Sequence, residues 1–314
     1  MNPNDPRILP YGEAAIAEAA RVIGQGGCVA VPTETVYGLA ANATDPRAVA
    51  GIYAAKGRPS FNPLIVHVPD LAAAERIAVF DAESRGLAER FWPGPLTLVL
   101  PVRTDSGIAS LVTAGLDTIA IRVPAHRAMQ ALLAAAGKPL AAPSANASGG
   151  ISPTRAAHVA ASLKGRIPLV IDDGATSAGL ESTIVMEGRV LRPGPLTLEE
   201  LFPGNRASDY ESEGQTSQTA VSAPGQLASH YAPSKPLRLN ATESNAERLI
   251  GFGDVAGDET LSASGDLAEA AANLFDALHR ADASDAAAIA VAPIPERGIG
   301  VAINDRLRRA AHRD

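Results

Sequence analysis

Residues 29–68 read VAVPTETVYGLAANATDPRAVAGIYAAKGRPSFNPLIVHV, and this stretch decides the fold. Two short runs rich in β-branched residues flank it, Val29–Val31 and Leu64–Val68, and each predicts a buried strand. Between them, Asp45-Pro46 predicts the start of a helix of about ten residues, because proline is favoured in the first turn of a helix. The stretch therefore predicts a strand, a polar turn, a helix, a cationic glycine-proline loop and a second strand.

Polar and cationic side chains gather at the ends of these two strands. They are Thr33, Glu34 and Thr35 after the first strand, and Lys56, Arg58 and Asn62 before the second. Ligands usually bind at strand ends in open α/β sheets, so hydroxyls and cations at these positions indicate an anion-binding site. The residues alone leave a second interpretation open, in which a helix N-cap is followed by a solvated basic turn.

The composition is that of an ordinary globular protein. The chain of 314 residues is long enough for two domains, and 46% of its residues are hydrophobic against 19% charged. The single cysteine, Cys28, excludes internal disulfides and cysteine-based zinc sites, and its place in an apolar strand predicts a buried thiol. Residues 1–10 do not resemble a signal peptide and no apolar run is long enough to span a membrane, so we expect a cytoplasmic protein without membrane contact.

The net charge of −7 is unevenly distributed. Residues 1–205 carry 17 Lys and Arg against 18 Asp and Glu, a balance of −1, whereas residues 206–314 carry 10 against 16, a balance of −6. This distribution argues against a protein that coats nucleic acid through bulk charge. A polyanion would instead be bound by local groups in the N-terminal part.

The chain as a whole predicts two α/β domains joined by a linker. In residues 1–205 strands alternate with helices, but several strand pairs look like hairpins, which favours a mixed sheet. Residues 206–234 begin with a stretch rich in Ser, Glu, Gln, Thr and Gly, which is typical of a linker. Residues 235–314 predict a small parallel α/β domain. Its expected strands are Leu237–Leu239, Leu249–Phe252 and Ala288–Val291, and its expected helices are Glu243–Arg248, Asp266–Ala281 and Asn304–His312.

The sequence has no phosphate loop of the G-x-x-x-x-G-K-[ST] type, no two histidines four residues apart and no G-x-S-x-G elbow. Cations on flexible stems at Lys56 and Arg58 suit a polyphosphate. Arg122 lies within the apolar run Ile119–Val123, where a buried cation needs either a carboxylate ligand or an Asp or Glu of the fold as its partner. His67 alternates with valines, a pattern more typical of a core histidine. Together these residues indicate a site with two cationic patches, one for a polyphosphate and one for a carboxylate.

Several ordered motifs resemble the YrdC-like (SUA/YciO/YrdC) family, and within it the two-domain L-threonylcarbamoyladenylate synthases. They are Pro32–Leu39 (PTETVYGL), Lys56–Pro59 (KGRP), Asn62–Leu64 with His67, Pro143–Asn146 with Ser152–Thr154, Ser182–Ile184, Arg192–Gly194, and residues 224–233 (PGQLASHYAP) in the linker. The resemblance covers nearly the whole chain, and it departs from the family pattern at Ala40, where a glycine is common. It implies a YrdC-like twisted, open mixed sheet with a small Rossmann-like C-terminal domain.

The resemblance also implies a reaction. L-Threonine, bicarbonate and ATP would give threonylcarbamoyl-AMP and diphosphate, with Mg²⁺ sharing the triphosphate charge, and the product would pass to the machinery that modifies tRNA. Catalysis would rest on positioning and charge neutralisation by Lys56 and Arg58. The implied threonine-binding residues are Thr35, His67, Arg122, Ala142 and Ser182. The implied ATP-binding residues are Arg58, Asn62, Thr118, Ser144, Asn146, Ser152, Arg192 and Tyr231, the last as part of a lid. The alternative for Tyr231 is an aromatic residue that packs and anchors the linker.

Two other functions fit parts of the sequence. Relatives of this fold are associated with double-stranded RNA, so a non-catalytic RNA- or tRNA-binding module is an alternative, but the −1 balance and the lack of a basic stripe count against it. Carbamoyl transfer, as in the hydrogenase-maturation relatives, would need zinc fingers that a single cysteine excludes. A nucleotide-sensing role for residues 235–314 stays open, as does direct contact with tRNA.

Overall fold

The computed structural model describes residues 5–204 and 230–312, so most of the predicted linker lies outside the described residues. In the N-terminal part, ten strands form one mixed sheet in the order β1-β8-β2-β3-β7-β4-β6-β5-β9-β10. The strands are β1 (Arg7–Pro10), β2 (Val29–Pro32), β3 (Tyr37–Asn42), β4 (Ile65–His67), β5 (Leu96–Pro101), β6 (Thr118–Arg122), β7 (Leu140–Ala141), β8 (Leu169–Asp172), β9 (Thr183–Met186) and β10 (Arg189–Arg192). The predicted mixed sheet is confirmed, since β6 pairs parallel with β4 and antiparallel with β5.

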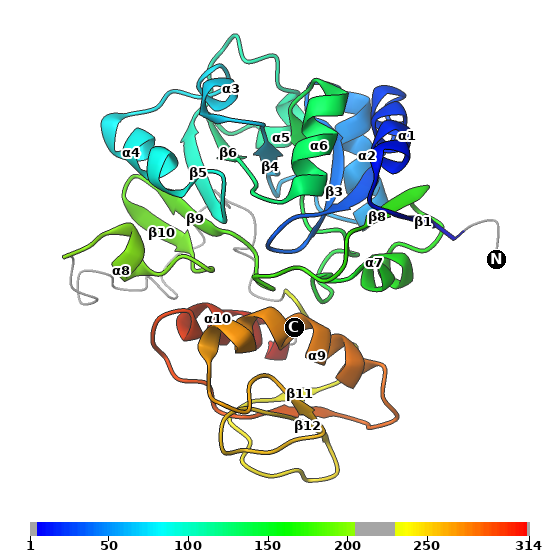
Figure 1. Ribbon diagram of the computed structural model, residues 1–314, viewed down its shortest axis with the longest axis vertical. Helices are drawn as coiled ribbons and strands as arrows, with labels where there is room; N and C mark the ends of the chain where they lie inside the picture. The colour runs from blue at the N-terminus through cyan, green and yellow to red at the C-terminus, as the bar shows by residue number, and fades with distance from the viewer. Residues whose placement is uncertain (1–4, 205–229, 313–314) are drawn as a thin grey trace.

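Helices cover both faces of this sheet (Figure 1). They are α1 (Glu13–Gly24), α2 (Pro46–Lys56), α3 (Leu71–Glu75), α4 (Ala82–Phe91), α5 (Ser110–Thr113), α6 (Arg127–Ala136), α7 (Ala156–Ser162) and α8 (Leu198–Leu201). Side chains alternate along a strand, so Ala30 of β2 packs into the core shared with α2, whereas Val29 and Val31 pack into the core shared with α1 and α6. Cys28 is buried as predicted, and burial raises the pKa of its thiol to about 11.

The deciding stretch contains one strand that the sequence analysis missed. β3 pairs antiparallel with β2, so the polar turn at residues 33–36 closes a hairpin instead of leading into a helix. The letters of β3, YGLAAN, include no β-branched residue, so local propensity gave no strand signal. The helix predicted from Asp45-Pro46 is confirmed as α2, and the Asp45 side chain accepts a hydrogen bond from the backbone N–H of Arg47.

The C-terminal part forms the predicted small parallel α/β domain. Its strands are β11 (Leu237–Arg238), β12 (Arg248–Gly251), β13 (Glu259–Thr260) and β14 (Ile289–Val291), all parallel in the order β11-β14-β12-β13. Its helices are α9 (Leu267–Asp282) and α10 (Gly300–Ala311), the second beginning four residues before the predicted start. The predicted helix Glu243–Arg248 is wrong, because this segment is a bend held by the Arg238–Glu247 ion pair and Arg248 already begins β12. Six residues are too few for a stable helix without packing support.

Helices α9 and α10 lie between the C-terminal sheet and the N-terminal domain (Figure 1). One hydrophobic cluster spans both domains and includes Val36 and Leu180 from the first and Phe275 from the second. The two domains approach each other closely at Gly179. Its φ is +69°, and an added Cβ would lie 2.3 Å from the carbonyl oxygen of Ala271. Only glycine fits there, so the sequence is adapted to this domain contact. Within residues 5–204 and 230–312, no helix combines the length and apolar character that a membrane crossing requires.

The domain interface also contains a stacked pair of histidines. The rings of His158 in α7 and His279 in α9 have centroids 3.8 Å apart, and Asp276 lies 3.3 Å from Nε2 of His158. Nδ1 of His158 accepts a hydrogen bond from the backbone N–H of Thr154, so the folded interface needs the unprotonated ring. Burial, and next the neighbouring His279, lower the pKa of His158 to about 4.

We therefore expect the folded chain to lose stability in mild acid. The unfolded chain takes up a proton at His158 near the ordinary pKa of 6.5, whereas the folded chain does so only near 4. The stability that His158 contributes is present above pH 6.5 and is lost as the pH falls toward 4, by about 3 kcal/mol. Urea unfolding at several pH values in this window tests the prediction. The variant His158→Gln should flatten this part of the profile, and an unchanged slope would refute the assignment.

Candidate active site

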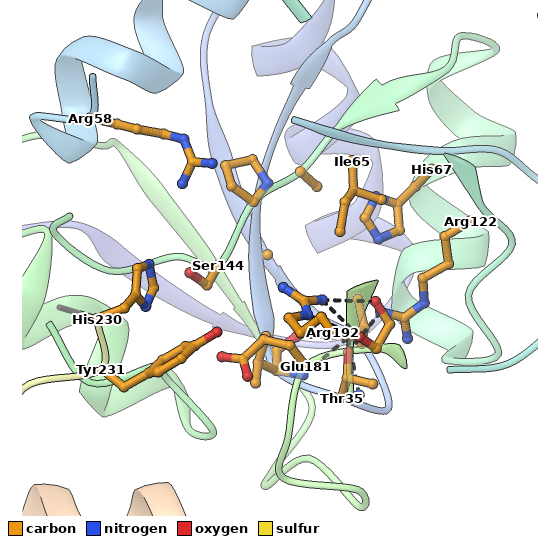
Figure 2. Close-up of a pocket in the computed structure, with 16 residues that line it drawn as sticks. Thr35, Arg58, Ile65, His67, Arg122, Ser144, Glu181, Arg192, His230 and Tyr231 are labelled. Atoms are coloured by element: carbon orange, nitrogen blue, oxygen red, sulfur yellow. Dashed lines mark hydrogen bonds between the residues drawn. The ribbon is translucent and has the colours of Figure 1, made fainter. Parts of the chain in front are cut away.

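A cavity opens beside the β2–β3 turn and the carboxyl ends of β4 and β6 (Figure 2). Its wall consists of Thr33, Thr35, Val36, Gly38, Arg58, Ile65, His67, Arg122, Ala142, Pro143, Ser144, Glu181, Ser182, Arg192, His230 and Tyr231. In Figure 2 the labelled polar and aromatic side chains form three groups: Thr35, His67 and Arg122 at one end, Arg58, His230 and Tyr231 at the other, and Ser144, Glu181 and Arg192 between them. Three arginines against one glutamate make this wall cationic, which suits an anionic ligand.

Arg122 is a buried cation, 3% exposed, with an anionic partner inside the fold. Its Nη2 lies 2.6 Å from Oε1 of Glu34, while Nε donates to the carbonyl of Gly94 and Nη1 to the hydroxyl of Thr35. Among the described residues, Nη2 and both Glu34 oxygens have no directed hydrogen bond, so the Glu34 contact is an ion pair only. Burial raises the pKa of Glu34, but the charge of the paired Arg122 outweighs burial and leaves the pKa below its usual value. The guanidinium therefore keeps the capacity to bind a second carboxylate.

His67 faces the cavity from β4. Ile65 and His67 pair with Ala120 and Arg122 of β6, and side-chain alternation places these four residues on one face of the sheet. Nδ1 of His67 is buried and has no hydrogen-bond partner among the described residues, which does not fit the satisfied core histidine expected from its pattern. Burial, and next the charge of Arg122, lower the pKa of His67 to about 3, so the ring is neutral near pH 7.

Arg192 and Arg58 are fixed by neutral oxygens. Arg192 donates from Nε and Nη2 to the carbonyl of Ser182, at 3.1 and 2.8 Å, and from Nη2 to the Ser182 hydroxyl, which lies 2.7 Å from the hydroxyl of Thr97. Arg58 donates from Nε to the carbonyl of Asn62 and from Nη2 to that of Pro63, at 3.2 and 3.0 Å. Because carbonyl groups orient both side chains without neutralising them, their positive charge remains available to an anion.

Lys56 and Asn146 do not line the cavity. Nζ of Lys56 donates to the carbonyls of Ser144 and Asn146, both at 2.6 Å, and Nδ2 of Asn146 donates to the carbonyl of Gly150 at 2.8 Å. Burial, and next the charge of Arg58, hold the pKa of Lys56 well below its usual value. Both side chains thus brace the loop at residues 144–150, which carries Ser144 into the cavity. Their direct contact with ATP stays a prediction.

Replacing Lys56 with methionine is expected to loosen this loop. Lys56→Met keeps the apolar stem but leaves two buried carbonyls without their donor, and each unmade bond costs about 1–3 kcal/mol. We expect the free energy of unfolding to fall by about 3 kcal/mol and ATP turnover to fall at least about tenfold. Urea unfolding and turnover measured on one preparation test this. Unchanged stability with lost turnover would contradict the bracing role and would indicate direct catalytic contact.

Three more predicted ATP ligands are not among the residues of the cavity wall. Ser152 is buried and its hydroxyl donates to Oε1 of Glu181, which does line the cavity. Asn62 is buried beside Arg58, and its Oδ1 has no partner among the described residues. Thr118 begins β6 on the same strand face as Ala120, whose pair Ile65 lines the cavity. The ATP contacts of these three residues stay predictions.

Tyr231 closes one end of the cavity. Its backbone has a φ of +65°, its side chain is 1% exposed, and its ring packs against Phe275 of α9 with centroids 5.6 Å apart. With Tyr231 and the adjacent His230 in place, the free volume is about 50 Å³. Small-molecule sites usually begin at about 300 Å³. The cavity is therefore smaller in this structure than a nucleotide site usually is.

Magnesium does not have a dedicated site on this wall. Among the described residues, no three His, Cys, Asp or Glu side chains form a group that could hold a metal ion. Glu181, the acidic residue of the wall, is bound by Ser152 and by Arg306 of α10. A Mg²⁺ ion that arrives with a nucleotide keeps several waters and needs only one or two protein carboxylates, so this wall suits a substrate-borne ion.

Sequence reasoning missed Glu181, His230 and Arg306. Glu181 directly precedes the Ser182 motif, but a lone acid there gave no chemical signal. Arg306 lies three residues after Ile303 and four before Ala310, which places it on the buried face of α10. A cation on a buried helix face needs an anionic partner, as Arg122 does in its strand, so this position was the available signal for Arg306.

Two family models match the chain. One, described as Telomere recombination, matches residues 21–194, and the other, described as Threonylcarbamoyl-AMP synthase, C-terminal domain, matches residues 196–312. The threonylcarbamoyl-AMP synthase of Pyrococcus abyssi is 40% identical, covering 95% of this chain and 94% of its own. That of Bacillus subtilis is 39% identical, covering 99% and 94%. A crystal structure of P. abyssi Sua5 complexed with L-threonine has a TM-score of 0.86 at 38% identity, with 97% of each chain covered.

Proposed function

The chain belongs to the threonylcarbamoyl-AMP synthase family, and we propose that the cavity in Figure 2 is where threonylcarbamoyl-AMP forms. The observation that carries this proposal is the two-ended cationic wall, with Arg122 at one end and Arg58 and Arg192 toward the other. Threonine's amine would capture bicarbonate as a carbamate with release of water, and a carbamate oxygen would attack the α-phosphorus of ATP as diphosphate leaves. Such a transfer needs mostly positioning and charge neutralisation, which this wall offers.

The end around Arg122 is our proposed threonine site, and a related structure complexed with L-threonine supports this assignment. Nη2 of Arg122 would bind the carboxylate, with the guanidinium held by Glu34 and Thr35. The neutral His67 ring and the Ser182 hydroxyl would contact the polar groups of threonine. Ala142 would contribute backbone only, and because its N–H already binds the carbonyl of Ile65, its own carbonyl is the group available.

The remainder of the wall is our proposed ATP site. Arg58 and Arg192 would bind the triphosphate, and Ser144 would contribute its hydroxyl. Asn62, Thr118, Asn146 and Ser152 would complete or brace this end, with Mg²⁺ entering on the phosphates. Tyr231 would act as a lid that opens for ATP and closes over it, which excludes water from a hydrolysable carbamate.

The chemistry of the product is the basis for the downstream partners and the location that we propose. Threonylcarbamoyl-AMP is an activated acyl donor, so it would pass directly to the enzymes that transfer the threonylcarbamoyl group to tRNA. A cytoplasmic location follows from that tRNA substrate. The chain would then consist of an N-terminal catalytic domain (1–205), a linker (206–234) and a C-terminal domain (235–314).

Isotopic labelling tests the proposed substrates. The full-length chain is incubated with Mg²⁺, ATP, L-threonine and ¹³C-bicarbonate, and the adenylate is analysed by mass spectrometry. We expect an adenylate that carries the label and forms only with threonine. An adenylate without the label would exclude bicarbonate as the source of the carbamoyl carbon.

A further inference from the structure

The C-terminal domain places a buried arginine directly against the cavity wall. Arg306 of α10 is 0% exposed, and its Nε donates to Oε2 of Glu181 at 2.9 Å. Its Nη1 donates to the carbonyl of Pro193 and to Oδ2 of Asp305, both at 2.8 Å. Its guanidinium carbon also lies 5.3 Å from the centre of the Tyr231 ring. One side chain thus contacts the acid of the wall, the segment after Arg192 and the proposed lid.

Glu181 would otherwise be an unfavourable group at a site for phosphates. It lines the cavity, and its second oxygen accepts the hydrogen bond of the Ser152 hydroxyl. The charge of Glu181 also acts on Arg192, one of the two arginines that we assign to the triphosphate. Without a cation of its own, this carboxylate would repel phosphate and compete with it for Arg192. Arg306 supplies that cation from the other domain.

We propose that Arg306 is a positioning residue for ATP: by neutralising Glu181 and packing on Tyr231, it makes the C-terminal domain part of the nucleotide end of the cavity. This inference rests on the proposed function, because it assumes that ATP binds at that end. It gives the C-terminal domain a direct role in the synthase reaction, distinct from a separate nucleotide-sensing function.

A double-mutant cycle tests whether Arg306 acts through Glu181. The KM for ATP is measured for wild type, Arg306→Met, Glu181→Gln and the double variant, and threonine binding is measured by calorimetry. We expect Arg306→Met to raise the KM for ATP at least about tenfold while the Kd for threonine stays within about twofold. In the Glu181→Gln background the same substitution should change the KM by less than about twofold. If Arg306→Met raised the KM for ATP by the same factor in the wild-type and Glu181→Gln backgrounds, the proposal would be overturned.

The two substrates provide a second readout that a purely structural role would not give. Arg306→Met should raise the KM for ATP while the Kd for threonine is retained, and an equal loss of affinity for both substrates would count against the proposal. Arg308→Met is the matched control on the same helix, since Arg308 pairs with Glu296 at the surface and its side chain is 56% exposed.

Folding and the proposed function are controlled separately. If Arg306→Met does not fold, the double variant Glu181→Gln/Arg306→Met decides the question: it removes both charges and should have a KM for ATP within about twofold of that of Glu181→Gln, and a loss above about tenfold would overturn the proposal. Wild-type turnover is measured in the same assay. A wild type that releases no pyrophosphate contradicts the proposed function, whereas an active wild type with equal losses in both backgrounds contradicts only the role of Arg306.

Discussion

A chain in which Arg122 is replaced by alanine is expected to lose threonine-dependent turnover of ATP. Arg122 is buried, and its Nη2 is the guanidinium nitrogen without a directed hydrogen bond among the described residues, so a threonine carboxylate would be bound there in a site of low dielectric. Removing one partner of such a pair costs roughly 2–5 kcal/mol. We therefore expect kcat/KM for threonine to fall at least about a hundredfold, measured by pyrophosphate release at varied threonine.

A control for folding is needed because Glu34 is the ion-pair partner of Arg122. Arg122→Ala leaves Glu34 as a buried unpaired carboxylate, and breaking a buried pair in this way destabilises a fold by about 3–5 kcal/mol. The double variant Glu34→Gln/Arg122→Met removes both charges and should fold, yet remain inactive. A folded double variant with wild-type kcat/KM for threonine would exclude Arg122 as the carboxylate ligand.

Replacing Arg58, at the opposite end of the cavity, is expected to lower kcat/KM for ATP by a similar factor. Carbonyls of Asn62 and Pro63 orient its guanidinium, and burial lowers its pKa only to about 10, so the side chain remains charged near pH 7. Arg58→Met should lower kcat/KM for ATP at least about a hundredfold, because a charge-assisted contact to phosphate is lost in a buried site. The Kd for threonine should stay within about twofold of wild type, because Arg122 is unaltered.

The matched control is Arg47→Met, which removes an exposed arginine from α2, the helix that ends just before Arg58. Its kcat/KM for ATP should equal that of wild type. If Arg58→Met weakened threonine and ATP equally, the separation of the cavity into two ends would be wrong.

The sequence predicted the elements that carry strong local signals. Asp45 followed by Pro46 fixed the start of α2, and Asp266 fixed that of α9, because capping chemistry is local. β3 was missed because tertiary pairing with β2, and not its own composition, makes residues 37–42 a strand. The predicted helix Glu243–Arg248 failed for the converse reason, since helix-forming residues there found no packing surface.

The candidate site was predictable where a residue type conflicted with its surroundings. Arg122 in an apolar strand signalled a buried cation, and its internal partner proved to be Glu34. Lys56 is predicted to act on the phosphates from its charge and from the resemblance, and this stays a prediction. Its hydrogen bonds from Nζ to the loop carbonyls could not be predicted, because the return of residues 144–146 beside α2 is a long-range contact. The Glu181–Arg306 pair joins residues 125 positions apart, and no local pattern encodes such a pair.

Pyrophosphate release from Mg·ATP by the full-length chain tests most directly whether this cavity joins threonine to a nucleotide. It is measured with and without L-threonine and bicarbonate, together with mass detection of the adenylate. We expect release only when both are present, with threonylcarbamoyl-AMP as the product. Release that does not depend on threonine, or no release from a chain that binds tRNA with steep salt dependence, would contradict it.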